Sequence, residues 1–161
     1  MNELLTTDKK LYEQLVENYH AGIQQDTEAT CTNFGENVFI EEQIQKKQIV
    51  TQVYVSACSV TYSLGDGDPE MWRIFSSLIL DCIFEFTLHT AFQNALRHQG
   101  EKGSKKVFLC PVGGGVFGND MSWIVGAIQK ALNKFKDIGL DVYLVSRSPK
   151  IEYEQILKEF C

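Results

Sequence analysis

The sequence predicts an α/β fold, specifically a three-layer α/β/α domain with a mostly parallel sheet. Three observations predict it. From residue 48 onward, the order is strand, long helix, strand, helix, strand, helix, an alternation that builds a parallel sheet with helices on its faces. One apolar strand opens into four glycines within six positions, and one long helix is apolar around most of its circumference. We therefore predict a single domain over residues 1–161, with a variable helix-and-loop region (1–47) and a β-α-β-α-β-α core (48–161).

The N-terminal region carries the weakest signals. Thr7 is a candidate N-cap for a helix over residues 8–20, with Gly22 as its stop. Residues 27–34 are rich in threonine and suggest a short strand, whereas residues 36–47 are polar and fit a loop or a frayed helix.

Residues 48–62 form the first strong strand pattern, with Val, Ile and Tyr interleaved with Thr. In the loop that follows, Asp68 and Pro69 suit the N-cap and first position of the next helix. Calcium is an alternative for the Gly-Asp-Gly-Asp run there, but the run lacks the later oxygen ligands and the final Glu of an EF-hand loop. We predict no metal site and no cofactor.

The long helix pattern runs from residue 70 to about residue 98. Its polar residues recur every fourth position, which makes the polar stripe wind around the helix, since four residues overshoot a 3.6-residue turn by roughly 40°. Asp81, Glu85 and His89 in its middle are candidates for a buried polar network and for catalytic groups. The alternative is a solvated stripe with i,i+4 pairs such as Glu85 with His89.

The second strand, over residues 107–112, leads into the glycine-rich stretch and then into an amphipathic helix over residues 121–136. Glycine lets the backbone approach a ligand and turn its N–H groups inward, and a helix N-terminus offers partial positive charge to a phosphate. The spacing is neither the dinucleotide fingerprint nor the Lys-containing P-loop. We predict an anion site made of Gly113, Gly114, Gly115, Val116, Phe117, Gly118 and Asn119. A purely structural tight turn remains the alternative, because such turns need glycine whatever they bind.

The remaining elements complete the alternation. Asn119 or Asp120 caps the helix after the glycines, and its predicted inner face comprises Ile124, Ala127, Ile128, Ala131, Leu132 and Phe135. Residues 140–146 predict a third buried strand. Ser148 and Pro149 begin a last helix that offers Ile151, Ile156, Leu157 and Phe160 to the core. Because the loops after parallel strands share one edge of the sheet, Ser63 and Arg147 join the predicted ligand-binding residues.

Composition narrows the function classes. A net charge of −6 argues against a surface that coats nucleic acid, which would need clustered Lys and Arg. We find no signal peptide and expect no membrane span, which predicts a cytoplasmic protein. The five cysteines show no metal spacing, and Cys58, Cys82 and Cys110 lie in apolar segments typical of reduced core residues.

The strand at residues 107–109, the Gly-Gly-Gly-Val-Phe-Gly-Asn loop and the helix containing Trp123 resemble the second ligand-binding loop and following helix of macrodomains, which are ADP-ribose-binding α/β/α modules. In particular they are similar to a divergent macrodomain-like family of uncharacterised proteins, in which residues 52–63, 72–94 and 107–146 have counterparts. The resemblance implies that residues 113–118 wrap the diphosphate of ADP-ribose or a related nucleotide and that Phe117 closes over the distal ribose. The first macrodomain loop and the early Asp for adenine have no counterpart between Met1 and Gln48, so the domain is incomplete at its N-terminus or is completed by a partner chain.

Competing functions follow. The first is a binding module for an ADP-ribose-like nucleotide, with ADP-ribosyl hydrolase activity that is vestigial or depends on a partner; Asp66 and Asp68 join the helix residues as titratable candidates. The second is a non-catalytic scaffold or interaction protein that keeps the fold with an incomplete site, and homo-oligomers would cover its apolar helix. A third is nucleophilic catalysis by Cys58 or Cys110 with His89 as the base.

Overall fold

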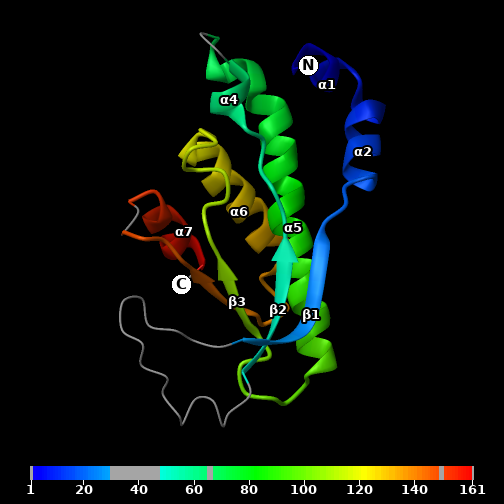
Figure 1. The fold of residues 1–161 in the computed structure, drawn as a ribbon, viewed down its shortest axis with the longest axis vertical. Coiled ribbons are helices and arrows are strands. Elements are labelled where there is room, and N and C mark those ends of the chain that lie inside the picture. Colours follow the sequence, from blue (N-terminus) through cyan, green and yellow to red (C-terminus); the bar gives the residue numbers. More distant parts are fainter. Residues whose placement is uncertain (1, 30–47, 65–66, 149–150, 161) are drawn as a thin grey trace. The chain divides into compact units, whose positions relative to one another are not determined.

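The computed structural model describes residues 2–29, 48–64, 67–148 and 151–160 (Figure 1). These residues form a mixed α/β protein with two compact units. The small unit is Gly22–Tyr54, and the large unit combines Met1–Ala21 with Val55–Cys161. The predicted loop at 36–47, most of the threonine-rich stretch, Asp66 and Pro149 lie outside the described residues.

The small unit is a pair of antiparallel strands, β1 (Gly22–Ala29) and β2 (Gln48–Tyr54). The register shifts between Gln24 and Thr27, where Asp26 has a positive φ of 55°, as in a β-bulge. The prediction of one strand over residues 48–62 in a parallel sheet is therefore wrong in two respects. The strand ends at Tyr54, and its partner is antiparallel.

The large unit begins with two short helices rather than one. The helix predicted over residues 8–20 is confirmed over Lys9–Glu17, but its predicted cap, Thr7, and its predicted stop, Gly22, are wrong. Asp8 is the N-cap of the second helix, since its carboxylate accepts a hydrogen bond from the Leu11 N–H (2.9 Å). The Thr7 hydroxyl donates to the Glu3 carbonyl (2.7 Å) within the first helix. The second helix ends at Glu17, well before Gly22. The two helices are α1 (Asn2–Thr7) and α2 (Lys9–Glu17).

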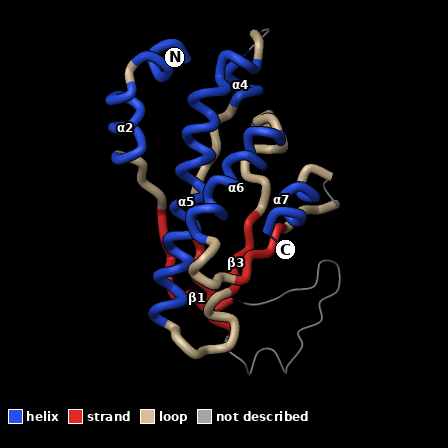
Figure 2. Tube along the Cα trace, turned by 180° about the vertical axis from the view of Figure 1, so that it is seen from behind, coloured by secondary structure: helices blue, strands red, loops and turns tan. Residues whose placement is uncertain are grey.

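The rest of the large unit contains helices on one side of a short sheet (Figure 2). Residues 55–59 join no strand ladder, and a single helical turn follows where the sequence predicts continued strand. The remaining elements are α4 (Val60–Leu64), the 3₁₀ helix η1 (Pro69–Trp72), α5 (Arg73–Arg97), β3 (Lys106–Leu109), α6 (Met121–Phe135), β4 (Asp141–Leu144) and α7 (Tyr153–Phe160).

β3 and β4 pair in parallel, with Phe108 opposite Tyr143 and Leu109 opposite Leu144. Parallel pairing of the second and third predicted strands is confirmed, but both strands are shorter than predicted and only one face is buried. Val107 and Leu109 join the core, whereas Phe108 is 65% exposed on the opposite face. The described part of the large unit thus shows one two-stranded parallel sheet covered by helices on one face.

The core lies where α5 and α6 pack on the sheet. The predicted inner face of α6 is confirmed in full, because all six of its residues are buried. On α7 the prediction is partly wrong: Ile156 is buried, but Ile151 and Leu157 are exposed. Ile151 precedes the first turn of the helix, and Tyr153 takes the inward position one turn before Ile156.

The long helix forms as predicted, over Arg73–Arg97. The predicted cap acts one turn earlier, on the 3₁₀ helix η1: the Asp68 carboxylate accepts from the Glu70 N–H (3.0 Å), with Pro69 at the first position, whereas the N-cap of α5 is Trp72. The segment Pro69–Arg97 has the length and hydropathy of a membrane span, contrary to the expectation from sequence, since its polar stripe is too sparse to offset the apolar residues. Much of that apolar surface is core, with Leu80, Ile83, Phe84 and Leu88 almost fully buried.

Candidate functional site

The glycine-rich loop divides into two structural parts, the first of which we call the base: Gly113, Gly118 and Asn119. Gly113 and Gly118 both have positive φ (83° and 69°), a conformation that side chains with a Cβ rarely adopt. The Asn119 N–H donates to the Gly113 carbonyl (3.0 Å), which closes the loop on itself. The base is therefore held by the protein's own hydrogen bonds.

The side chain of Asn119 lies inside the base and is only 4% exposed. Its amide nitrogen donates to the Cys58 carbonyl (2.7 Å) and to the Gly113 carbonyl (3.2 Å). These bonds tie the loop to the extended segment before α4. Asn119, a predicted ligand-binding residue, thus has a clear structural role, although its buried Oδ1 has no protein partner.

Close packing explains why both base glycines are needed. A Cβ added to Gly118 would lie 1.9 Å from the Thr61 hydroxyl oxygen, and a Cβ added to Gly113 would lie 2.5 Å from the Ala57 Cβ. No side chain fits at either position without movement of the neighbouring segment. The structural alternative raised by the sequence therefore holds for these two glycines.

The second part of the loop, residues 115–117, we call the crown. Gly115 and Val116 are exposed, and a Cβ added to Gly115 would meet nothing within 4 Å. The N–H of Gly114 donates to the Pro111 carbonyl and that of Gly118 to the Gly115 carbonyl. Between them, within the described residues, the N–H groups of Gly115, Val116 and Phe117 donate to no protein acceptor. Successive peptide N–H groups of this kind are anion-binding features of loops.

The N-terminus of α6 is occupied by the protein itself. The Asp120 carboxylate accepts from the Ser122 N–H (2.7 Å) and the Ser122 hydroxyl (2.6 Å), and these hydrogen bonds lower the pKa of Asp120. A negative charge already compensates this end of the helix. The Asp120 carboxylate therefore disfavours a phosphate at the helix N-terminus, which leaves the crown as the candidate anion site.

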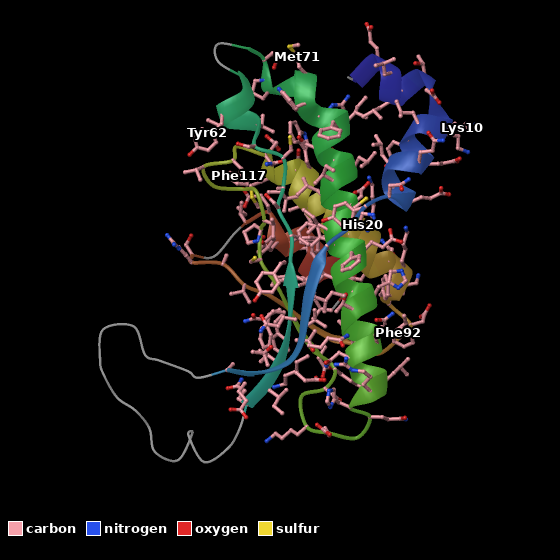
Figure 3. All side chains as sticks on the ribbon, turned by 45° about the vertical axis from the view of Figure 1, so that its right-hand side comes forward. Lys10, His20, Tyr62, Met71, Phe92 and Phe117 are labelled. Carbon is pink, nitrogen blue, oxygen red and sulfur yellow. The ribbon has the colours of Figure 1, made fainter. Side chains whose placement is uncertain are left out.

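An aromatic pair borders the crown. The rings of Phe117 and Tyr62 meet edge to face, with centroids 6.5 Å apart and planes at 80°, and Figure 3 shows both side chains on the same side of the protein. The Thr61 N–H donates to the Phe117 carbonyl (3.0 Å), so α4 is bonded directly to the loop. Tyr62 is not among the residues that the sequence predicts to bind a ligand, because the apolar run that contains it fits a strand.

The other two predicted ligand-binding residues are Ser63 and Arg147. The backbone of Ser63 lies in α4, next to Tyr62, and its side chain is not among those that the structure describes. Arg147 is exposed just after β4, and the Val145 N–H bonded to the Leu109 carbonyl (2.8 Å) confirms that the two strands end at one edge. Among the described residues, no interaction joins Arg147 to the crown.

Asp81, Glu85 and His89 come together, but away from the loop. Lys130 pairs with Asp81 (2.8 Å) and Lys134 pairs with Glu85, while His89 lies 3.9 Å from Glu85 and packs its ring on Phe135. Figure 1 shows α5 and α6 side by side, and these pairs require the helices to run in the same direction. Lys130 is ten residues beyond Asp120, or about 15 Å along the helix.

In this ion-pair ladder the expected buried network is absent among the described residues, because the His89 and lysine side chains are mostly exposed. The alternative, a solvated stripe with an i,i+4 pair between Glu85 and His89, is confirmed for that pair, and Asp81 and Glu85 also bridge to the lysines of α6. One oxygen of Asp81 is buried without a partner. The ladder fixes α5 against α6 and offers no acid or base to the crown.

The cysteines also differ from expectation. Cys82 is a core residue whose pKa rises to about 11, first through burial and then through the charges of Asp81 and Glu85. Cys58 is half-buried and Cys110 is exposed, so the core assignment is wrong for Cys110. Cys58 lies beside Asn119, before the start of α6, whereas His89 packs at the end of that helix, so the two do not form a nucleophile–base pair. Within the described residues no cluster of potential metal ligands occurs.

Comparisons of the chain with family models, with curated proteins and with solved structures each found no match. The geometry of the loop and of its aromatic border is therefore what points to a function.

Proposed function

We propose that the protein binds ADP-ribose or a related nucleotide diphosphate at the crown, within a macrodomain-like three-layer α/β/α arrangement. The observation that carries the proposal is the run of three peptide N–H groups at an exposed loop, those of Gly115, Val116 and Phe117, that donate to no acceptor in the described part of the chain. Amides of this kind form charge-assisted hydrogen bonds to phosphate oxygens without any lysine or arginine. The resemblance of the loop to the second ligand-binding loop of macrodomains supports the same ligand.

The neighbouring charges restrict where the anion sits. Asp120 carries a negative charge immediately after the base, so a diphosphate is repelled from the α6 N-terminus. The crown side of the loop avoids that carboxylate. Because the ion-pair ladder supplies no general acid or base there, the proposed function is binding, and hydrolysis forms no part of it.

The test is a calorimetric or thermal-shift titration with ADP-ribose. A ligand at one hundred times its dissociation constant stabilises the folded protein by about 2.7 kcal/mol. Gly115→Val has room for its side chain and leaves the fold intact, but its bulk blocks the approach of a ligand to the crown amides. We expect this variant to melt like the parent protein and to lose the ligand-induced shift.

Gly126→Val is the matched control, because a Cβ at Gly126 also meets open space, in α6. Because valine is a better helix former than glycine, this variant should keep the stability of the parent protein and its affinity for ADP-ribose. Absence of any shift for the parent protein at millimolar ADP-ribose would refute the proposed function. Unchanged affinity in Gly115→Val would place the ligand elsewhere.

A scaffold or interaction function is the second candidate, and the exposed face of the β3–β4 sheet favours it. Phe108 and Tyr143 stack across the strands, with centroids 5.2 Å apart, and Val145 is exposed beyond them. Exposed apolar faces of this kind mark interaction sites. Sedimentation of the parent protein and of Phe108→Ser tests this candidate: self-association that the substitution abolishes supports it, and a monomer at all concentrations removes the evidence for a homo-oligomer.

A further inference from the structure

We propose that Tyr62 is a ligand-binding residue, and that Tyr62 and Phe117 together form an aromatic lip that selects the nucleoside or sugar part of the ligand. This inference rests on the proposed function, because the lip acts on a ligand whose phosphates bind the crown. It adds a residue from α4 that neither the apolar pattern nor the glycine motif indicated.

The exposure of Tyr62 is the first observation. Its side chain is 72% exposed. Val60, two residues earlier, is only 1% exposed and anchors α4 in the core. The Tyr62 ring is not part of the described hydrophobic core, and it meets the Phe117 ring in a T-shaped arrangement. A large aromatic ring in this position presents a face to whatever binds beside the loop.

The position of the backbone that carries the Tyr62 ring is the second observation. The hydrogen bond from the Thr61 N–H to the Phe117 carbonyl and the close packing of Thr61 on Gly118 hold the backbone of α4 against the loop. The two residues of the lip are therefore next to each other before the ligand arrives. Binding then costs less ordering of the protein than it would if Tyr62 were on a free segment.

Phe117 belongs both to the crown amides and to the aromatic lip. The carbonyl of Phe117 holds α4, its N–H belongs to the crown, and its ring forms half of the lip. Peptide amides recognise phosphate oxygens, whereas an aromatic face stacks on a base or packs on a sugar. A ligand that uses both has a phosphate group joined to a nucleoside or sugar, and inorganic pyrophosphate uses only the amides.

The other exposed aromatic pair lacks this arrangement. Phe108 and Tyr143 are direct cross-strand partners, and their stacking is explained by sheet pairing. Tyr143 is also covered on one side by the ammonium group of Lys106, 5.7 Å from the ring centroid. Tyr143 is therefore a suitable control for loss of an exposed tyrosine that is not part of the lip.

The experiment compares Tyr62→Ala, Tyr62→Phe and the control Tyr143→Ala by calorimetric titration with ADP-ribose and with inorganic pyrophosphate. Loss of one stacked ring weakens binding of the nucleotide by about tenfold or more. We expect Tyr62→Ala to show that loss for ADP-ribose and no change for pyrophosphate. Tyr62→Phe, which keeps the ring, and Tyr143→Ala should both bind like the parent protein.

Three results would overturn the inference. Parent-like ADP-ribose affinity in Tyr62→Ala refutes the lip, and loss of binding in Gly115→Val would then show that the proposed function itself survives. Equal losses for ADP-ribose and pyrophosphate would show that Tyr62 only supports the loop. No binding of either compound by the parent protein removes both the lip and the proposed function.

Discussion

The base and the crown of the glycine-rich loop are neighbours in sequence but differ in packing, backbone conformation and hydrogen bonding. The base is buried or tightly packed, has positive φ at both glycines and is closed by protein hydrogen bonds. The crown is open to solvent at Gly115, and its N–H groups have no acceptor among the residues that the structure describes. The comparison shows that one glycine-rich motif serves two purposes, since some glycines allow the chain to pack and another leaves space for a ligand.

Substitution in the base should have the largest effect. Gly118→Val places a β-branched side chain at a φ of 69° and against Thr61, so we expect a loss of at least about 3 kcal/mol in the free energy of unfolding. Urea denaturation measures it. A loss as small as that of a surface substitution would show that the base adapts easily and would remove the distinction between the two parts.

Asn119→Ala should come next. The change removes two hydrogen bonds and leaves the carbonyls of Cys58 and Gly113 without this donor, which costs about 2 kcal/mol. Denaturation of Asn119→Ala and of Cys58→Ala separates the effects, because the Cys58 side chain is not the acceptor and its loss leaves the hydrogen bond in place. A stable Asn119→Ala protein would contradict the structural role of this amide.

Asp120 gives a smaller effect with a defined pH dependence. Asp120→Ala removes the N-cap of α6 and should cost about 1 kcal/mol at neutral pH. Because the folded-state pKa of Asp120 lies below its ordinary value of 3.8, the stabilisation is complete above that pH and disappears as the pH falls through the lowered pKa. The stability difference between the parent and Asp120→Ala should therefore vanish in acid.

Asp120→Asn is the matched variant, since asparagine is also a good N-cap but does not titrate there. It should keep most of the stability and lose this acid dependence. An acid dependence that survives in Asp120→Asn would assign it to another carboxylate.

The crown should show the smallest effect on stability. Gly115→Val adds a side chain in open space at a residue without positive φ, so its free energy of unfolding should stay within about 0.5 kcal/mol of the parent value. The same denaturation experiment measures it. Destabilisation comparable to that of Gly118→Val would show that the crown is packed in solution.

Local patterns predicted the elements whose partners are local. The six inner residues of α6, the Asp68 cap and the pairing of β3 with β4 follow from helical periodicity, capping chemistry and strand–helix alternation. The run at residues 48–62 was misjudged because an apolar pattern does not reveal its partner. Its first half pairs antiparallel with β1, and the Thr61 N–H bonds the distant Phe117 carbonyl.

The sequence predicts which stretch of chain forms the candidate site, but not which of its residues have a structural role and which are open to a ligand. Glycine content indicated the loop, yet only the approach of Ala57 and Thr61 separates Gly113 and Gly118 from Gly115. Tyr62 was missed for the same non-local reason. The cap at Asp120 was predicted, but its effect on the charge at the helix end became evident only from the hydrogen bonds it makes.

Amide hydrogen exchange across the loop, followed residue by residue by NMR, tests the division into base and crown most directly. In the ligand-free protein, the N–H of Asn119 should exchange slowly and those of Gly115 and Val116 rapidly, since only the first of these donates to an acceptor in the described ranges of the chain. Saturating ADP-ribose should protect Gly115, Val116 and Phe117 and leave Asn119 unchanged. Strong protection of the crown amides without ligand, or ligand-induced protection confined to other parts of the chain, would contradict the account.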